Sequence, residues 1–398
     1  MMIRQNGFVR FLGYIAFCLL TFFVGSSTQT DYITPTNAAS RLLENRTDEL
    51  VLMFMGDTQY HFPCTVSNGP CKLASEAFRQ KNQLNNNCER NDRKGLASLQ
   101  VQDLEEQCAI MEGSFSNEVQ RKAIFDLYRR MNNKPKGLIL NGDLTNFGHK
   151  YQLDLFKVSE TISLLTLELL KTEWLSMPFP IFVGLGNHDY QNNVDDCVAN
   201  QFTTEYAPLM NITLDMETSS ELWKTVREGS FAYYKDFCSQ SEENCVHSIQ
   251  LHNRPDFAAS VSSVTLWRIR SSFQWLRNDL DRMRNRTWPV LINLHNYEAK
   301  GSGERLRREL TGWLESDENS AIIRKPFVLF AHYHEKHSMT VECIGGTMVP
   351  FLYVGSVPRN RYTVIKFKGN RAEIFFMNAN SDGTNTVVGI REFTWKPC

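Results

Sequence analysis

The sequence is 398 residues long, and 42% of its residues are hydrophobic while 22% are charged. These ordinary values indicate a globular protein with enough apolar residues for a sizeable core. Lys and Arg total 43 against 44 Asp and Glu, a formal net charge of −1. The composition therefore shows no basic surplus, and we expect no binding of polymeric nucleic acid.

Residues 1–27 predict a signal peptide. Arg4 and Arg10 make the start of the chain basic, residues 11–25 are apolar, and small residues follow as Gly25-Ser26-Ser27. The apolar run is shorter than the ~20 residues that span a bilayer, so an uncleaved anchor is the less favoured alternative. We expect a secreted or lumenal product of the secretory route, with no transmembrane segment after signal cleavage.

Cysteines and glycosylation motifs agree with that route. Of ten cysteines, Cys18 lies in the predicted signal, and the nine that remain favour disulfides over a cytosolic metal cluster. N-glycans are expected only if the chain enters the secretory route of a eukaryote. The three acceptor motifs begin at Asn45, Asn211 and Asn285.

The first half of the chain alternates between strand and helix patterns. A strand is predicted over 51–55, and a polar insertion over 61–116, whose four cysteines predict a disulfide-tied lid or a plain surface excursion. Helix patterns over 117–131 and 151–174 each precede an apolar strand, at 137–140 and 181–183. This alternation predicts a layered α/β protein.

The second half predicts one further helix and several strands. The helix, over 272–283, would bury Leu276 and Leu280. The whole of 48–380 is expected to form one domain, with a C-terminal tail over 381–398. The predicted strands lie at 229–234, 247–251, 290–292, 327–330, 348–354, 362–368 and 372–377.

Five polar segments each follow one of the predicted strands, which would bring their side chains to one rim of a sheet. Each segment alone is ambiguous, because Gly-Asp is commonly a turn and a single His is commonly a surface or core residue. Together they supply the ligands of a two-metal hydrolase. They are Asp57-Thr58-Gln59, Gly142-Asp143, Gly186-Asn187-His188-Asp189, His295 and His332-Tyr333-His334.

Two-metal chemistry explains the residue types. A shared carboxylate, for which Asp143 is suited, offsets the repulsion between two cations about 3.5–4 Å apart. Water bound between the cations would have a pKa near ~7 and provide hydroxide as the nucleophile. His188 would protonate the leaving group or stabilise charge on the phosphoryl oxygens, with Asp189 holding its ring.

The order of these motifs resembles that of the calcineurin-like metallophosphoesterase family, whose pattern is D-x-H, G-D, G-N-H-D, a lone H and G-H-x-H. The resemblance runs from about Val51 to His334. It implies a four-layer α/β/β/α sandwich and two divalent cations (Mn, Mg, Zn or Fe) joined by Asp143. It assigns Asp57, Gln59 and His334 to the first metal, and Asn187, His295 and His332 to the second.

Two positions depart from the family pattern. Gln59 stands where His is usual, and Ala331 replaces the Gly before the last His-x-His. A carboxamide oxygen is a weaker and harder ligand than imidazole, which favours Mn²⁺ or Mg²⁺. Active family members with D-x-Q exist, so this change does not by itself imply an inactive protein.

The predicted function is that of a secreted phosphoesterase that cleaves phosphomonoesters or phosphodiesters through a metal-bound hydroxide. Its substrate would be a small-molecule or lipid-linked phosphoester. One alternative is a secreted binding protein on the same scaffold, with catalysis weakened by Gln59. Another is an exported nuclease, which would need a basic groove near the metals, whereas the basic residues of 81–94 are scattered.

Overall fold

The computed structural model describes residues 35–44, 46, 48–59, 104–145, 174, 177–190, 202–221, 223–262, 265–283, 286–299, 301–316 and 323–398. All of them belong to one compact unit, Pro35–Cys398. The predicted signal peptide, most of the insertion, nearly all of the helix expected over 151–174, and Asn45 and Asn285 lie outside the described residues.

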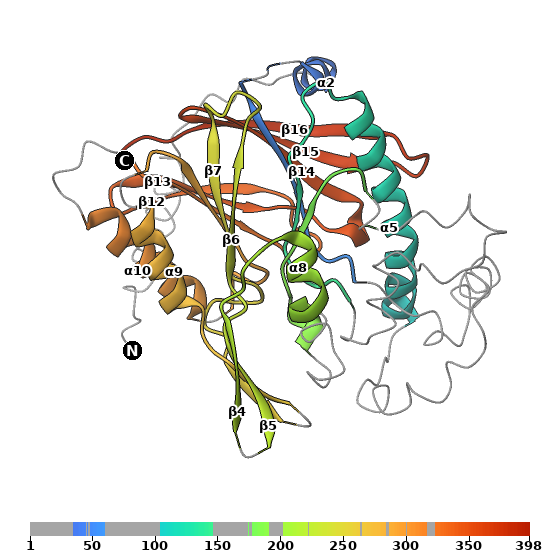
Figure 1. The fold of residues 1–398 in the computed structure, drawn as a ribbon. Helices are drawn as coiled ribbons and strands as arrows, with labels where there is room; N and C mark the ends of the chain where they lie inside the picture. Colours follow the sequence, from blue (N-terminus) through green and yellow to red (C-terminus); the bar gives the residue numbers. More distant parts are fainter. Residues whose placement is uncertain are drawn as a thin grey trace, which may run out of the picture. The chain divides into compact units, whose positions relative to one another are not determined.

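The first large sheet has six strands in the order β16-β15-β14-β1-β2-β3 (Figure 1). β1, β2 and β3 are parallel to one another. The pairs β1–β14, β14–β15 and β15–β16 are antiparallel. The central strand β1 is buried at every position, as its continuous apolar run requires. The strands are β1 Leu50–Met55, β2 Leu138–Leu140, β3 Ile181–Val183, β14 Arg361–Lys368, β15 Arg371–Ala379 and β16 Asn385–Thr394.

The second large sheet also has six strands, in the order β12-β13-β11-β10-β7-β6. Its four inner strands are parallel, and β6 and β12 close the two edges as antiparallel strands. The strands are β6 Tyr233–Cys238, β7 Cys245–Gln250, β10 Pro289–Asn293, β11 Lys325–Phe330, β12 Met339–Ile344 and β13 Thr347–Tyr353.

Helices cover the outer faces of the two sheets. The long helix α5 packs on β15 and β16, and α2 packs on β16, while α9 and α10 share a core with the second sheet. Figure 1 shows α5 on one side and α9 and α10 on the other, which confirms the predicted layered α/β class. The helices are α2 Pro35–Leu43, α5 Leu104–Arg130, α8 Ala207–Met210, α9 Phe273–Arg282 and α10 Ser302–Glu315. None of the helices in the described part of the chain has the length and apolar character that a membrane crossing needs.

A small third sheet was not foreseen from the sequence. Its order is β4-β5-β9-β8, with β4 Met216–Glu221, β5 Lys224–Gly229, β8 Ala259–Ser262 and β9 Leu266–Ile269. The strand predicted over 229–234 is wrong, because the chain turns there between β5 and β6. Phe231 has a left-handed φ of 60° and donates its N–H to the Asp215 carbonyl at 3.1 Å. Residues 229–234 favour a strand by composition, so the sequence pattern alone does not predict a turn at this position.

Two other boundaries differ from the predicted ones. α5 begins at Leu104, so its first turns occupy residues assigned to the insertion. Residues predicted as a C-terminal tail instead form β16 and the buried Trp395, whose indole N–H donates to the Pro326 carbonyl at 2.9 Å. Pairing along β15 and this contact between the two sheets make the C-terminus part of the fold.

The described residues contain two disulfides. Cys238–Cys245 joins the edge strand β6 to its neighbour β7, and Cys343–Cys398 ties β12 to the last residue of the chain. Both lie outside the cysteine-rich insertion, whose predicted disulfides fall outside the described residues.

A buried histidine lies between two carboxylates near the outer edge of the second sheet. His247 on β7 places Nδ1 2.6 Å from Asp236 on β6 and Nε2 2.7 Å from Asp279 on α9. Arg282 lies 3.4 Å from the other oxygen of Asp279. Burial disfavours the imidazolium, but the two carboxylates outweigh it and raise the pKa of His247 above the ordinary 6.5.

This pKa shift predicts a pH-dependent contribution to stability. Because the folded-state pKa is raised, the stabilisation is fully present below pH 6.5 and is lost as pH rises through the folded-state value. We expect His247→Asn to lower the free energy of unfolding by about 2–3 kcal/mol at pH 6 and by less at pH 9, measured by urea unfolding. Asp281→Asn, an exposed carboxylate on the same helix, is the matched control. Equal losses at the two pH values would contradict the ionic role of His247.

Candidate metal centre

The carboxyl ends of the parallel strands bring the predicted ligands together. Asp57 follows β1, Asp143 follows β2 and Asn187 follows β3 in the first sheet, while His295 follows β10 and His332 follows β11 in the second. Backbone bonds join the first two loops: Asp57 N–H donates to the Gly142 carbonyl at 3.0 Å, and Gln59 N–H to the Asp143 carbonyl at 2.8 Å. The site therefore lies where the same ends of both sheets meet.

His295 is the hub of the cluster. Its buried Nε2 lies 3.1 Å from Oδ2 of Asp143, 3.0 Å from Oδ1 of Asn187 and 3.2 Å from Nδ1 of His332. Its Nδ1–H donates to the Asn141 carbonyl at 2.8 Å, which directs the Nε2 lone pair at the other three atoms. A backbone carbonyl on the second ring nitrogen is the usual support of a metal-binding histidine.

This arrangement requires positive charge. Asp143, His295 and His332 each place a ligand atom within 4.8 Å of the other two. Lone pairs that lie 3.0–3.2 Å apart, as they do around Nε2 of His295, repel each other unless a proton or a cation lies among them. The mixed carboxylate, amide and imidazole donors suit a divalent cation such as Mn²⁺, Mg²⁺, Zn²⁺ or Fe²⁺.

Asp57, Gln59 and His334 form the other half of the cluster. Both carboxylate oxygens of Asp57 are buried without a hydrogen bond to any described residue, and His334 Nε2 lies 3.5 Å from Oδ1. The Gln59 amide donates to Oδ2 of Asp143 at 3.3 Å, so this side chain reaches the carboxylate expected to bridge. A buried carboxylate that accepts no close hydrogen bond is costly, and a cation beside Asp57 would offset that cost more fully than His334 at 3.5 Å does.

The pKa shifts describe a site that stabilises positive charge. Burial disfavours a charged His295, yet the Asp143 carboxylate outweighs it and raises the pKa of His295 to about 9. Burial alone would raise the pKa of Asp143, but the His295 and His188 contacts hold it well below its usual range. The pKa of His332 is lowered by burial and by the charge of His295.

Strained backbone is concentrated at these ligands. Four of the predicted ligands have a positive φ: Asp57 (56°), Gln59 (38°), Asp143 (53°) and His332 (70°). Such left-handed conformations cost of order 1–3 kcal/mol each in residues other than glycine and cluster at functional sites. The strain at these ligands is a second, independent sign of a binding site.

Glycine is required at two positions in the cluster. A Cβ at Gly186 would lie 2.1 Å from Oδ1 of Asp143, and one at Gly142, whose φ is +89°, would lie 2.8 Å from the Cβ of His295. Ala331, by contrast, is accommodated because it faces Gly56, where any Cβ would lie 2.3 Å from that of Ala331. The Gly missing at 331 is thus compensated by the Gly at 56.

Both carboxylate oxygens of Asp189 accept hydrogen bonds from the surrounding loops, and its predicted hold on the ring of His188 stays a prediction. Its Oδ1 accepts from the Thr145 N–H and hydroxyl at 3.0 and 2.8 Å, and its Oδ2 from the N–H groups of Leu144 and Gly186 at 3.1 and 2.8 Å. Burial and the Asp143 charge still raise the pKa of Asp189 to about 6. Asp189 therefore joins the loops after β2 and β3, which positions Asp143 and Asn187.

His188 itself is half-buried beside the cluster. Its backbone N–H donates to Oδ1 of Asp143 at 2.9 Å. This bond occupies the oxygen of Asp143 that faces away from His295, and it fixes the carboxylate orientation. The bond fixes the backbone of His188 beside Asp143, and the role predicted for its ring stays a prediction.

His252 is a supporting residue that sequence reasoning missed. The Leu185 N–H donates to its Nδ1 at 2.8 Å, its Nε2–H donates to the Phe231 carbonyl, and its own carbonyl accepts the His295 N–H at 2.8 Å. Burial lowers its pKa to about 4, so the ring is neutral. The signal was present, since His252 directly follows the predicted strand 247–251 as the ligands follow theirs.

Known proteins resemble this chain in sequence or in structure. The model of the family described as calcineurin-like phosphoesterase matches residues 51–336, the stretch that holds every motif. No curated protein matched the chain. Among solved structures, a dimetal phosphatase from Danio rerio is 11% identical, with 87% of this chain and 99% of that chain covered and a TM-score of 0.44. Vacuolar Protein Sorting 29 from Cryptosporidium parvum is 11% identical, with 87% and 98% covered and a TM-score of 0.29.

Removal of the Asp143 charge should disrupt the centre. We expect Asp143→Asn to weaken binding of Mn²⁺ by about 10–100-fold, because the carboxylate proposed to lie between two cations loses its charge. The circular dichroism spectrum should be unchanged. Isothermal titration calorimetry measures the affinity, and Glu217→Gln, an exposed carboxylate on β4, is the control. Wild-type affinity in the Asp143 variant would rule out this carboxylate as a ligand.

Proposed function

Because this chain belongs to the calcineurin-like phosphoesterase family, we propose that it is a two-metal phosphoesterase that hydrolyses phosphomonoesters or phosphodiesters. One observation carries the proposal: Asp143, Asn187 and His332 direct ligand atoms at Nε2 of His295 from 3.0–3.2 Å. Packing alone gives no reason for three strand ends to present lone pairs to one buried nitrogen.

In this proposal the chain divides its ligands between two cations. Asp57, Gln59 and His334 hold one, Asn187, His295 and His332 hold the other, and Asp143 lies between them. When bound, such cations make a hydroxide nucleophile available near neutral pH and polarise the phosphoryl oxygens. The chain supplies the strained loops, the Asp189 ties and the His252 support that hold these side chains in place.

His188 is assigned the contact with the substrate. It follows Asn187 directly, and its backbone N–H is bonded to Asp143, which supports a ring position beside the cluster. From there the imidazole would donate a proton to the leaving oxygen or a hydrogen bond to the phosphoryl group. The substrate is a small-molecule or lipid-linked phosphoester.

The activity is tested with p-nitrophenyl phosphate and bis(p-nitrophenyl) phosphate in Mn²⁺, Mg²⁺, Zn²⁺ or chelator. We expect hydrolysis of at least one ester that requires added metal, and a fall in turnover of roughly 10²–10⁴ in His188→Ala, the usual worth of a positioned acid–base group. Metal content of that variant, measured by plasma emission, should equal that of the wild type.

Three results would count against this proposal. Hydrolysis that persists in chelator would exclude the metal mechanism, and full activity of His188→Ala would exclude its assigned role. Tight metal binding with no turnover of either ester would instead favour a binding protein weakened by Gln59. The relative rates on the two esters decide between monoester and diester specificity.

We also propose that the protein is secreted or lumenal and carries N-glycans. The two disulfides support an oxidising compartment. Asn211 supports glycosylation because it begins the motif Asn211-Ile212-Thr213 and its side chain is exposed, at the end of α8, where an enzyme can reach it. Its backbone is left-handed there, with φ of 50°.

Expression in cultured eukaryotic cells tests the compartment. We expect the protein in the medium, with a gel mobility that increases after glycosidase treatment and shifts after reduction. Asn211→Gln should remove one glycan-sized step, and Asn380→Gln, which is in no acceptor motif, should remove none. A product that stays in the cytosol without glycans would contradict the proposed compartment.

A further inference from the structure

The hairpin formed by β4 and β5 carries a tryptophan at its tip. Glu221 at the end of β4 pairs with Lys224 at the start of β5, so the connection is two residues long, with the sequence Leu222-Trp223. Trp223 is 103% exposed, which means that no described residue covers its indole. Figure 1 shows the hairpin extending beyond the two large sheets. The tip therefore presents a large apolar ring to the surroundings of the molecule.

The backbone at the tip disfavours this type of residue. Two-residue connections between antiparallel strands favour Asn-Gly and similar pairs, because their turns need a positive φ. Trp223 has a φ of 73°, which is an outlier for a bulky side chain, whereas glycine adopts it readily. Such conflicts between local preference and structure are concentrated at functional positions. The tryptophan at this turn therefore indicates a role outside the folding of the chain.

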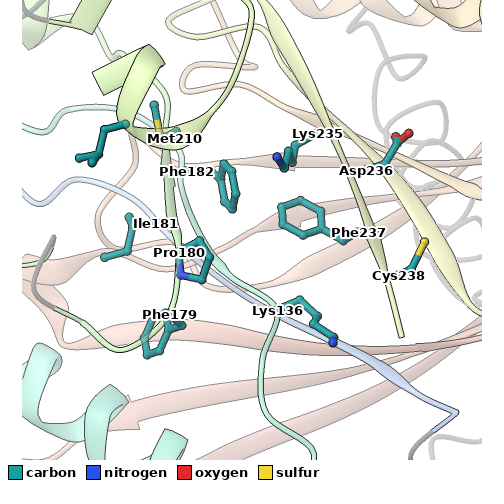
Figure 2. Close-up of a pocket in the computed structure, with 11 residues that line it drawn as sticks. Lys136, Phe179, Pro180, Ile181, Phe182, Met210, Lys235, Asp236, Phe237 and Cys238 are labelled. Atoms are coloured by element: carbon teal, nitrogen blue, oxygen red, sulfur yellow. The ribbon is translucent and has the colours of Figure 1, made fainter. Parts of the chain in front are cut away.

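The base of the same sheet is packed, in contrast to its tip. Val226 on β5 and Trp267 on β9 are buried in the core. Leu209, another exposed apolar residue, is 69% exposed but borders a cavity of about 540 Å³ beside α8, whose lining includes Phe182 and Phe237 (Figure 2). The third sheet is thus anchored at its base and holds the indole of Trp223 away from the packed core.

The charges of this sheet balance one another. Arg268 donates to the two oxygens of Glu221 at 2.9 and 2.8 Å, and Arg270 lies 2.7 Å from Glu228. Residues 217–220 of β4 are exposed and mostly polar. The described surface around Trp223 therefore has neither a wide apolar patch nor a net charge. The four strands hold three acidic residues, Glu217, Glu221 and Glu228, and three basic residues, Lys224, Arg227 and Arg268.

We propose that Trp223 docks the protein on the surface of a lipid bilayer with zwitterionic headgroups. Tryptophan is enriched at that level of a membrane, because its ring is apolar while its N–H still reaches a polar partner. A stable protein interface needs about 800 Å² on each partner, whereas one tryptophan buries about 150–250 Å² and its described neighbours are polar. A bilayer needs no complementary patch, and the balanced charges give no preference for anionic lipid. This proposal does not rest on the phosphoesterase activity.

Sedimentation of the purified full-length protein with phosphatidylcholine vesicles tests the docking role. We expect the bound fraction to rise with lipid concentration. The partition coefficient should fall about tenfold in Trp223→Gly, as for one large side chain that is no longer buried in an apolar phase. Trp223→Phe, which keeps an aromatic ring, should retain most of the binding. Val388→Ser, which changes a 52% exposed apolar residue on β16, is the matched control and should bind as the wild type does.

Thermal unfolding separates docking from a structural role. The unfolding temperature of Trp223→Gly should not fall, because relief of the strain at φ 73° offsets the greater freedom of glycine in the unfolded chain. Loss of binding together with a lowered unfolding temperature would mark Trp223 as a structural residue and overturn the proposal.

Salt and chelator distinguish this surface from other sources of binding. Neither should change the partition coefficient, because the charges of the hairpin balance and the metal centre takes no part. Binding that disappears in high salt would show electrostatic attraction instead of docking by the indole. Absence of binding by the wild type, or equal binding by Trp223→Gly, would overturn the proposal whether or not the protein hydrolyses phosphoesters.

Discussion

The structure depends on a concentration of lone pairs around one buried nitrogen. Nε2 of His295 lies 3.0–3.2 Å from a carboxylate, an amide and a second imidazole, and the nearby carboxylate of Asp57 is buried without a hydrogen bond to the described residues. Burying a carboxylate without close hydrogen bonds costs several kcal/mol, and the ring of His334, 3.5 Å away, offsets only part of that cost. This arrangement is stable only when positive charge is held there, which explains why the pKa of His295 is raised to about 9.

Ties between the loops hold the cluster in place against this repulsion. Asp189 joins the loops after β2 and β3 through bonds to three backbone N–H groups and the Thr145 hydroxyl. Asn141 links the sheets, because its amide donates to Leu329 at 3.1 Å while its carbonyl accepts from His295. His252 adds a third tie. Rigid positioning by such surrounding bonds is what keeps metal-binding and catalytic side chains in their working geometry.

The same strands serve different sites at their two ends. β7 carries His247 between two carboxylates near one end and leads to His252 at the other. β3 contributes Phe182 to the lining of the cavity beside α8, and the chain continues from it to Asn187 in the metal centre. Because a strand is stiff and its side chains alternate between two faces, a short segment can line a cavity and still place a ligand at the rim.

The sequence by itself determined the layered α/β class and the motifs of the metal centre, because apolar runs followed by Asp57, Asp143, Asn187, His295 and His332 are local patterns that need no knowledge of distant contacts. Only the tertiary structure decided the role of Asp189, since its partners at Leu144 and Thr145 lie on another loop. The turn at Phe231, the small sheet and the buried C-terminal strand also depend on pairing between distant segments. The cavity beside α8 exists only where strands from two sheets meet, which no single stretch of sequence records.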